Sequence, residues 1–238
     1  MKRIMLILAT AVLLSACVKT PVDPQNIHFS ILGDSYSAFE GYIDPATNDP
    51  YEYEIIGVTD VEQMWWYKLS VNMGWTMEKN NSFSASPISN FSDFEGGDFY
   101  KPNSFLNRMD NLGNPDVILV FGATNDSYYG APLGDYVYQD WNEDQLCSFR
   151  PAMSYLFDGL KRQYPNARIY FMLDMDLCSG GIDEELRDKY IESVHVVARH
   201  YDVPCIDLKN IHKKQWHPDV KGQKMIADQV TDYLQTYY

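Results

Sequence analysis

The segment Ile27-His28-Phe29-Ser30-Ile31-Leu32 runs directly into Gly33-Asp34-Ser35, so a nearly continuous apolar run ends in a polar turn. Four further apolar runs rich in β-forming residues follow, at 75–78, 116–121, 168–173 and 203–208. Runs of this kind are typical of parallel strands that are covered by helices on both faces. We therefore expect five parallel strands.

Segments with helical spacing of apolar residues lie between and after these runs, at 61–73, 105–112, 150–163, 183–200 and 221–237. Gly74 is expected to end the first of these helices and Asp183 to start the fourth. Strands alternating with helices predict an α/β fold with right-handed crossovers. We expect a three-layer α/β/α sandwich of the flavodoxin-like type, built on an open five-stranded parallel sheet.

The composition favours one domain and narrows the choice of partners. The chain has 238 residues, of which 45% are hydrophobic, and this is ample for one sizeable core. The formal net charge of −14 is spread along the chain. Such a surface disfavours nucleic acid and anionic lipid headgroups, which require clustered Lys and Arg. An acidic surface does not exclude neutral substrates.

The N-terminus resembles a bacterial export signal. Lys2 and Arg3 precede an apolar run at 4–14, which is followed by Ser15-Ala16-Cys17. Eleven apolar residues at about 1.5 Å each fall well short of a hydrocarbon core of about 30 Å. Leu14-Ser15-Ala16-Cys17 resembles the lipobox, in which the cysteine is lipidated and becomes the mature first residue. An ordinary signal peptide that ends near a cysteine is the alternative.

This resemblance predicts the organisation of the chain. We expect a lipoprotein signal peptide at 1–16, a lipidated tether with two prolines at 17–26, and a folded domain at 27–238. The protein would then be located in the cell envelope, either in the periplasm or at the outer-membrane surface. Its contact with the membrane would be made only through the lipid on Cys17.

The remaining cysteines are Cys147, Cys178 and Cys205. An odd number permits one disulfide with a free thiol, or no disulfide. Cys178 and Cys205 lie near two strands expected to be neighbours and would form the most plausible pair, but all three can equally be small buried side chains. Neither the cysteines nor any set of His, Asp and Glu has the spacing of a metal site, so we expect no metal and no cofactor.

Three polar residues follow expected strand ends or precede a helix. Ser35 comes directly after the first strand, Asn125 follows the third, and His217 with Pro218 precedes the last helix. A serine hydroxyl there can attack a carbonyl carbon, a histidine can accept its proton, and an amide can donate to a developing oxyanion. Each residue alone is a weak signal, because turn serines, turn asparagines and surface histidines are common.

Their order and placement resemble the SGNH (GDSL-like) hydrolase family from about residue 27 to the end. The matching segments are Ile31-Leu32-Gly33-Asp34-Ser35-Tyr36-Ser37, Val120-Phe121-Gly122-Ala123-Thr124-Asn125-Asp126, and His217-Pro218 followed by Gly222. The resemblance implies that Ser35 is the nucleophile, His217 the general base and Asn125 an oxyanion donor.

Two positions depart from the family pattern. Ala85, in Asn80-Asn81-Ser82-Phe83-Ser84-Ala85-Ser86, stands where the family has a glycine whose backbone N–H completes the oxyanion hole. Alanine keeps this N–H, but we expect it to hinder a positive φ and to narrow the hole slightly. Lys214 stands three residues before His217, where the family has the aspartate that orients the histidine.

A lysine cannot accept the His217 N–H, so another group must orient the ring. Two arrangements are open: a Ser–His dyad held by a backbone carbonyl, or a triad completed by Asp207 or Asp219. Asp34 and Asp126, which flank the expected catalytic residues, are interpreted as acids that fix loops.

Three long irregular segments, at 39–59, 82–104 and 126–147, are expected after strand carboxyl ends, where open α/β sheets bind ligands. We expect several of their aromatic side chains to line the crevice, where they suit sugar faces and also acyl chains. The candidates are Tyr36, Phe39, Tyr42, Tyr51, Tyr53, Tyr128, Tyr129, Tyr136, Tyr138 and Trp141.

The expected activity is therefore that of a serine ester hydrolase that removes O-acyl groups, acetyl among them, from a carbohydrate or a small acylated molecule. The choice of a carbohydrate rests on the aromatic segments, the expected anchor and the family resemblance. A lipase or thioesterase acting on acyl chains is one alternative. A surface lipoprotein that binds glycans without catalysis is the other, and the residues at 85 and 214 are its main support.

Overall fold

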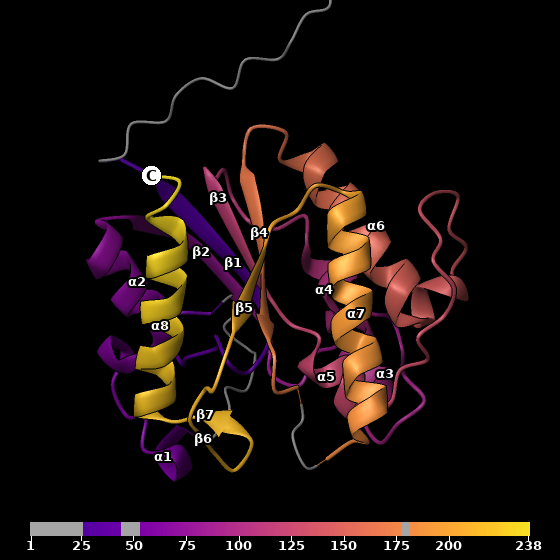
Figure 1. Cartoon of the computed structure of the whole chain (residues 1–238), viewed down its shortest axis with the longest axis horizontal. Helices are drawn as coiled ribbons and strands as arrows, with labels where there is room; N and C mark the ends of the chain where they lie inside the picture. The colour runs from indigo at the N-terminus through magenta and orange to yellow at the C-terminus, as the bar shows by residue number, and fades with distance from the viewer. Residues whose placement is uncertain (1–25, 44–52, 178–180) are drawn as a thin grey trace, which may run out of the picture.

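A computed structural model describes residues 26–43, 53–177 and 181–238. Its sheet contains five parallel strands in the order β2-β1-β3-β4-β5, which confirms the expected fold class (Figure 1). The strands are β1 His28–Gly33, β2 Thr76–Ser82, β3 Val117–Phe121, β4 Arg168–Asp174 and β5 Cys205–Leu208. This order reverses direction between β1 and β3, the point at which flavodoxin-like sheets bind ligands.

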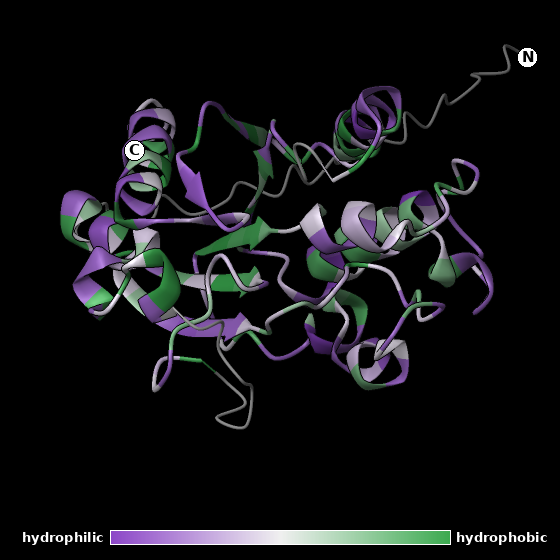
Figure 2. Ribbon diagram, turned by 90° about the horizontal axis from the view of Figure 1, so that it is seen from below, coloured by the Kyte–Doolittle hydropathy of each residue, from purple (hydrophilic) through white to green (hydrophobic). Residues whose placement is uncertain are grey.

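Two layers of helices enclose the sheet. Helices α2 (Trp65–Met73) and α8 (Val220–Leu234) cover one face, and α6 (Phe149–Gln163) and α7 (Glu184–His200) cover the other. Figure 2, seen from below, shows the apolar central strands between these layers. Each face has its own core of aliphatic and aromatic side chains, so the central strands are apolar on both sides.

The remaining elements are short and lie in the connections. They are the helices α1 Tyr53–Ile56, α3 Gly97–Tyr100, α4 Phe105–Arg108 and α5 Thr124–Tyr129, the 3-10 turns Val61–Gln63, Lys101–Asn103 and Gln145–Cys147, and the antiparallel hairpin β6 Lys213–Lys214 with β7 His217–Pro218. In Figure 1, α1, α3, α5 and the β6–β7 hairpin all lie at the lower end of the sheet.

The expected helix boundaries are confirmed where a cap is present. Gly74 ends α2 with a φ of 67°, and the Asp183 side chain accepts hydrogen bonds from two backbone N–H groups at the start of α7. The helix expected at 105–112 is wrong in its length, because α4 ends at Arg108.

The second strand is also longer than expected, since β2 extends to Ser82 instead of ending at 78. Its last residues are polar but buried, and their side chains have partners inside the protein. The Asn80 amide donates to the Ser37 carbonyl at 2.9 Å, and the Asn81 amide donates to the Arg108 carbonyl at 2.9 Å. Polar residues satisfied in this way give no apolar signal in the sequence.

Within the described ranges, no helix has the length and apolarity needed to cross a membrane. The expected signal peptide, the tether up to residue 25 and Cys17 lie outside the described residues, as does Cys178. Cys147 and Cys205 have free thiols, and burial raises the pKa of Cys205 to about 12. Cys205 is therefore a partly buried free thiol on β5 and, of the two expectations, is closer to the small packed side chain than to the disulfide.

Candidate active site

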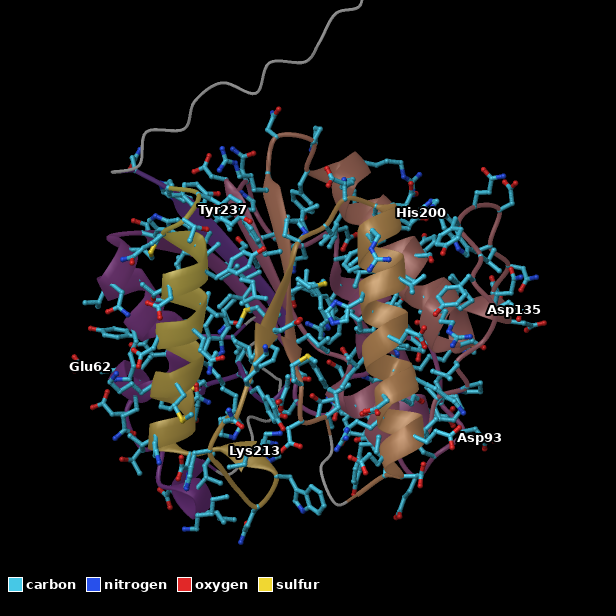
Figure 3. All side chains as sticks on the ribbon, in the orientation of Figure 1. Glu62, Asp93, Asp135, His200, Lys213 and Tyr237 are labelled. Atoms are coloured by element: carbon cyan, nitrogen blue, oxygen red, sulfur yellow. The ribbon has the colours of Figure 1, made fainter. Side chains whose placement is uncertain are left out.

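The register of the central strands brings three loops together. Gly33 at the end of β1 is level with Ser82 on β2 and with Phe121 on β3. The residues that follow these strand ends, among them Ser35, Ala85 and Asn125, therefore emerge at the same edge of the sheet. This is the lower end of the molecule in Figure 3, where Lys213 is labelled, and it is opposite to Tyr237.

Ser35 lies in a tight turn directly after β1 and is 6% exposed. The Asp34 carbonyl accepts hydrogen bonds from the N–H groups of Ser37 and Ala38, both at 3.1 Å, and these close the turn. Gly33 is required for the close approach of β2, because a Cβ there would lie 2.7 Å from the Ser82 hydroxyl oxygen. The turn thus holds the serine hydroxyl above the end of the sheet.

His217 lies within hydrogen-bonding distance of this serine. Its Nε2 is 3.0 Å from Ser35 Oγ, and its Nδ1 is 3.1 Å from the backbone carbonyl oxygen of Gln215. Because a carbonyl can only accept, Nδ1 carries the proton and Nε2 is left to accept from the serine. Of the two arrangements considered for the ring, the geometry is that of a backbone carbonyl.

The two aspartates considered as orienting acids have other partners. Asp207 Oδ1 lies 3.5 Å from His195 Nε2. Asp219 caps α8 by accepting from the Gly222 N–H at 2.9 Å, and its other oxygen lies 2.8 Å from His212 Nδ1. Lys214 is exposed on β6.

The β6–β7 hairpin presents His217 to the serine. Its two central residues, Gln215 and Trp216, have φ values of 48° and 70°. Two-residue turns with positive φ at both positions are usually formed by Asn-Gly. The Tyr36 hydroxyl donates to the Trp216 carbonyl at 2.6 Å, and the Tyr36 ring contacts the His217 ring edge to face at 5.5 Å. Tyr36 therefore fixes both the hairpin turn and the imidazole.

The charged side chain that shifts the pKa of His217 is a cation, Lys213, and not an acid. Burial lowers the pKa of His217, the hydrogen bond that its Nδ1–H donates to the Gln215 carbonyl opposes this shift, and the Lys213 ammonium lowers the pKa further. Lys213 is held by the buried Asp174 carboxylate at the end of β4, at 2.5 Å. The neutral form of the imidazole, which can accept a proton, is thereby favoured.

Asn125 and Ala85 follow β3 and β2, the two strands that flank β1 and the Ser35 turn. The Asn125 amide donates to the Ser86 carbonyl at 3.1 Å and to the Asp34 carboxylate at 3.3 Å. Ala85 adopts a positive φ of 61° although it carries a Cβ, so the alanine keeps the backbone conformation for which a glycine would be suited. The turn is closed by Ser86, whose N–H and hydroxyl both donate to the Phe83 carbonyl. This closure offsets the local cost, about 1–2 kcal/mol for a residue with a Cβ.

Two buried acids fix the surrounding loops, in agreement with their interpretation from the sequence. The Asp126 carboxylate accepts from the N–H groups of Ile88 and Ser89 and from the Ser89 hydroxyl. Asp34 accepts from the Tyr36 N–H at 3.0 Å as well as from Asn125. Burial raises the pKa of Asp34 to about 7.

A family model described as GDSL-like Lipase/Acylhydrolase matches residues 27–234. The chain belongs to the GDSL-like lipase/acylhydrolase family. Family membership makes it a hydrolase that acts on esters.

Two solved GDSL-like lipases from Bacteroides are similar over nearly the whole described fold. The chain is 41% identical to the protein from Bacteroides ovatus, covering 88% of this chain and 98% of that one with a TM-score of 0.78. It is 40% identical to the protein from Bacteroides uniformis, covering 89% and 96% with a TM-score of 0.78. No curated protein matches the chain.

A carbohydrate acetylesterase from Sinorhizobium meliloti shares the fold at 12% identity, with 89% of this chain and all of that chain covered and a TM-score of 0.60.

The aromatic residues of this GDSL-like hydrolase divide into two groups. Tyr128 and Tyr129 lie on α5 beside Asn125, and the Tyr129 ring stacks on Phe94 at 3.8 Å. Tyr136, Tyr138 and Trp141 pack instead with side chains of α6 and α7. The ring of Tyr138, for example, stacks on His200, which Figure 3 places far from Lys213. The expectation that several aromatic rings line the crevice therefore does not extend to this second group.

Two further candidates, Phe39 and Tyr42, follow the Ser35 turn in the chain. Their rings contact each other, and the Tyr42 ring also contacts Trp66. Tyr51 lies outside the described residues, and Tyr53 begins α1.

One residue of the site, Arg108 at the end of α4, was not predicted from the sequence. It is buried and donates hydrogen bonds to the Gly33 carbonyl and to the Ser86 hydroxyl. No motif marks this arginine. Its only signal is a cation placed among the apolar residues Phe105, Leu106 and Met109. In the described ranges, no group of three or more His, Cys, Asp or Glu side chains is arranged to hold a metal ion.

Proposed function

We propose that this chain is a serine esterase that removes O-acyl groups, acetyl among them, from a carbohydrate. The observation that carries the proposal is the position of His217, with Nε2 at 3.0 Å from Ser35 Oγ and Nδ1 at 3.1 Å from the Gln215 carbonyl. This is the contact a nucleophile and its general base require.

The reaction proceeds through an acyl-enzyme. Ser35 Oγ attacks the ester carbonyl carbon while His217 Nε2 takes the hydroxyl proton. The oxyanion is stabilised by the backbone N–H groups of Ser35 and Ala85 and by the Asn125 amide. As the tetrahedral intermediate collapses, the bond to the alcohol oxygen breaks and His217 gives that oxygen its proton. Water then attacks the acyl carbon and loses a proton to His217. As this second intermediate collapses, the bond to Ser35 Oγ breaks, His217 returns the proton to Ser35 Oγ, and the acid leaves.

Asn125 must release one partner in this mechanism. Its amide donates to Asp34 at 3.3 Å and to Ser86 at 3.1 Å. The longer hydrogen bond is the weaker, so the oxyanion replaces the Asp34 carboxylate. This exchange costs little, since Asp34 has a raised pKa and bears less than a full negative charge at neutral pH.

A carbohydrate is favoured by the exposed rings near the strand carboxyl ends. Tyr42, Phe99, Tyr128 and Trp216 are all between 46% and 61% exposed. Between the rings of the 91–100 segment lie the exposed acids Asp93, Glu95 and Asp98. Rings that alternate with polar groups suit a hydroxylated substrate, whereas a long acyl chain requires a continuous apolar patch. The carbohydrate acetylesterase with the same fold is in keeping with this choice.

We also propose the cellular setting expected from the sequence. Cleavage before Cys17, with lipidation of that cysteine, would anchor the esterase in the cell envelope within reach of acylated glycans. Palmitate labelling in a bacterial host, lost in Cys17→Ser, tests the anchor separately from the activity.

The activity is tested with p-nitrophenyl acetate, butyrate and octanoate beside an acetylated oligosaccharide. We expect hydrolysis to be fastest with the acetyl ester, acetate to be released from the oligosaccharide, and Ser35→Ala to remove both activities. A fluorophosphonate should label wild type but not Ser35→Ala. A rate that rises with acyl length would favour a lipase. Lack of both labelling and hydrolysis in wild type would contradict the esterase and favour a non-catalytic binding protein.

A further inference from the structure

Arg108 is buried directly below the turns that carry Ser35 and Ala85. Its side chain leaves the end of α4 and is 6% exposed. One terminal nitrogen, Nη2, donates to the Gly33 carbonyl at 3.1 Å and to the Ser86 hydroxyl at 2.9 Å. Nη1 donates to the backbone carbonyl of Asn81 and to its side chain, and Nε donates to the Asn103 carbonyl at 2.7 Å.

Through Gly33 and Ser86, these contacts connect Arg108 indirectly to every residue proposed to bind the oxyanion. Gly33 is two residues before Ser35, and Ser86 directly follows Ala85. The Ser86 carbonyl in turn accepts from the Asn125 amide. One planar guanidinium therefore links the strand end before the nucleophile to the turn that carries the other two donors. A fork of fixed geometry is well suited to set this spacing.

The charge of Arg108 is not cancelled by a hydrogen-bonded carboxylate. All of its hydrogen-bond acceptors in the described ranges are neutral oxygens. Asp34 acts on it through space, and burial lowers the pKa of Arg108 to about 9, so it remains a cation at neutral pH. Burying a cation without a paired carboxylate lowers the stability of the folded protein, so packing alone does not explain an arginine at this position.

We propose that Arg108 is a positioning residue for ester hydrolysis. It holds the Ser35 and Ala85 turns at the spacing that the oxyanion requires, and it places a positive charge beneath that oxyanion. This role rests on the proposed esterase function, because it concerns a charge that develops only when Ser35 attacks a carbonyl.

Such a role has a kinetic signature that packing alone does not have. An interaction that is stronger in the transition state lowers kcat when it is removed and leaves KM nearly unchanged. Loss of one oxyanion-hole donor typically costs about 10²–10³-fold in kcat. For Arg108→Met, which keeps an unbranched stem but removes the guanidinium, we expect kcat to fall about 10²-fold and KM to change less than about threefold.

A boronic acid gives a second measure that does not depend on turnover. Phenylboronic acid forms a tetrahedral anionic adduct with a serine nucleophile, so its affinity reports on the oxyanion site. We expect its inhibition constant to rise in Arg108→Met in parallel with the loss of kcat. Arg108→Lys, which keeps the charge but not the fork, should lie between wild type and Arg108→Met in both measurements.

Arg150 provides a matched control. It donates to the Ser193 hydroxyl at 2.9 Å and to the Gly134 carbonyl at 3.0 Å, and its guanidinium lies 4.3 Å from the centroid of the Tyr136 ring. Arg108 likewise lies 5.0 Å from the centroid of the Phe105 ring. We expect Arg150→Met to lower the melting temperature while kcat and the boronate inhibition constant stay within about twofold of wild type.

Ser86→Ala decides the question if Arg108→Met does not fold. It removes the hydroxyl that Arg108 Nη2 contacts and, with it, that hydroxyl's bond to the Phe83 carbonyl, but it keeps the Ser86 N–H bond that also closes the Ala85 turn. We expect a loss in kcat of about tenfold with KM nearly unchanged. Folded Arg108 or Ser86 variants that keep wild-type kcat and boronate affinity would overturn the proposal, as would a rise in KM alone. A wild type without esterase activity would instead contradict the proposed function.

Discussion

Three effects shift the pKa of His217, and only one of them favours the imidazolium ion. Burial lowers the pKa, the Lys213 ammonium lowers it further, and the hydrogen bond that His217 donates to the Gln215 carbonyl raises it. The general base must be neutral, so activity rises as pH increases through this pKa. A lowered pKa therefore places the acid limb of kcat/KM below the usual value of about 6.5.

Replacing Lys213 by methionine should move this acid limb to higher pH. The substitution removes the positive charge that lowers the pKa of His217, and this favours the imidazolium ion. It should also destabilise the protein by about 3–5 kcal/mol, because Asp174 is left buried without its partner. The pH profile of kcat/KM and chemical denaturation measure the two effects.

Lys214→Met is the control for this prediction. Lys214 is the neighbouring lysine but is exposed to solvent, which screens its charge, so we expect its pH profile to match that of wild type. An acid limb that stays unchanged in Lys213→Met, or shifts equally in both variants, would contradict the assigned influence of Lys213.

At the level of single elements, the β6–β7 turn shows what the sequence could not reveal. The Ser35, Asn125 and His217 motifs predicted which loops meet, because their positions after strands and before a helix are visible in the chain. The choice between a backbone carbonyl and an acid was not visible, since every residue has a carbonyl and its direction depends on turn geometry. Arg108 was missed for a similar reason, because nothing in the sequence separates a buried arginine from an exposed one.

The strand signals were limited in the same physical way. The apolar strands β1, β3 and β4 were predicted nearly to their ends, because both of their faces are buried. The end of β2 was missed, since its buried Asn80, Asn81 and Ser82 are satisfied by hydrogen bonds rather than by apolar contacts.

The hairpin turn itself can be improved without loss of the dyad. Gln215 has a φ of 48°, a conformation that asparagine adopts more readily than glutamine. We expect Gln215→Asn to raise stability by up to about 1 kcal/mol and to keep kcat, because the carbonyl that orients His217 belongs to the backbone. Thermal unfolding and steady-state kinetics test both parts.

Gln215→Pro provides the opposite case. Proline fixes φ near −65°, so the turn cannot keep its conformation and the carbonyl moves away from His217 Nδ1. A loss of kcat of at least about 10²-fold is expected, since an imidazole in the wrong tautomer can cost up to about 10⁴-fold. Full activity in Gln215→Pro would show that the Gln215 carbonyl does not orient the base.

At the level of the whole molecule, the acidic surface should select among acylated glycans. The chain carries a formal net charge of −14, and the acids Asp93, Glu95 and Asp98 are exposed in the 91–100 segment next to its aromatic rings. A substrate that contains uronic acids would be repelled by this field, whereas a neutral acetylated oligosaccharide would not. Salt screens repulsion between exposed charges, with a Debye length of about 10 Å at 0.1 M.

This predicts a difference in salt dependence between two acetylated substrates of equal size. Raising the salt concentration from about 20 to about 200 mM should increase kcat/KM for an acetylated oligogalacturonide several-fold and change that for an acetylated xylo-oligosaccharide less than about twofold. The triple variant Asp93→Asn, Glu95→Gln and Asp98→Asn should reduce the salt response of the anionic substrate only. Equal salt responses for the two substrates, or an anionic substrate that is preferred at low salt, would mean that the acidic surface does not govern substrate choice.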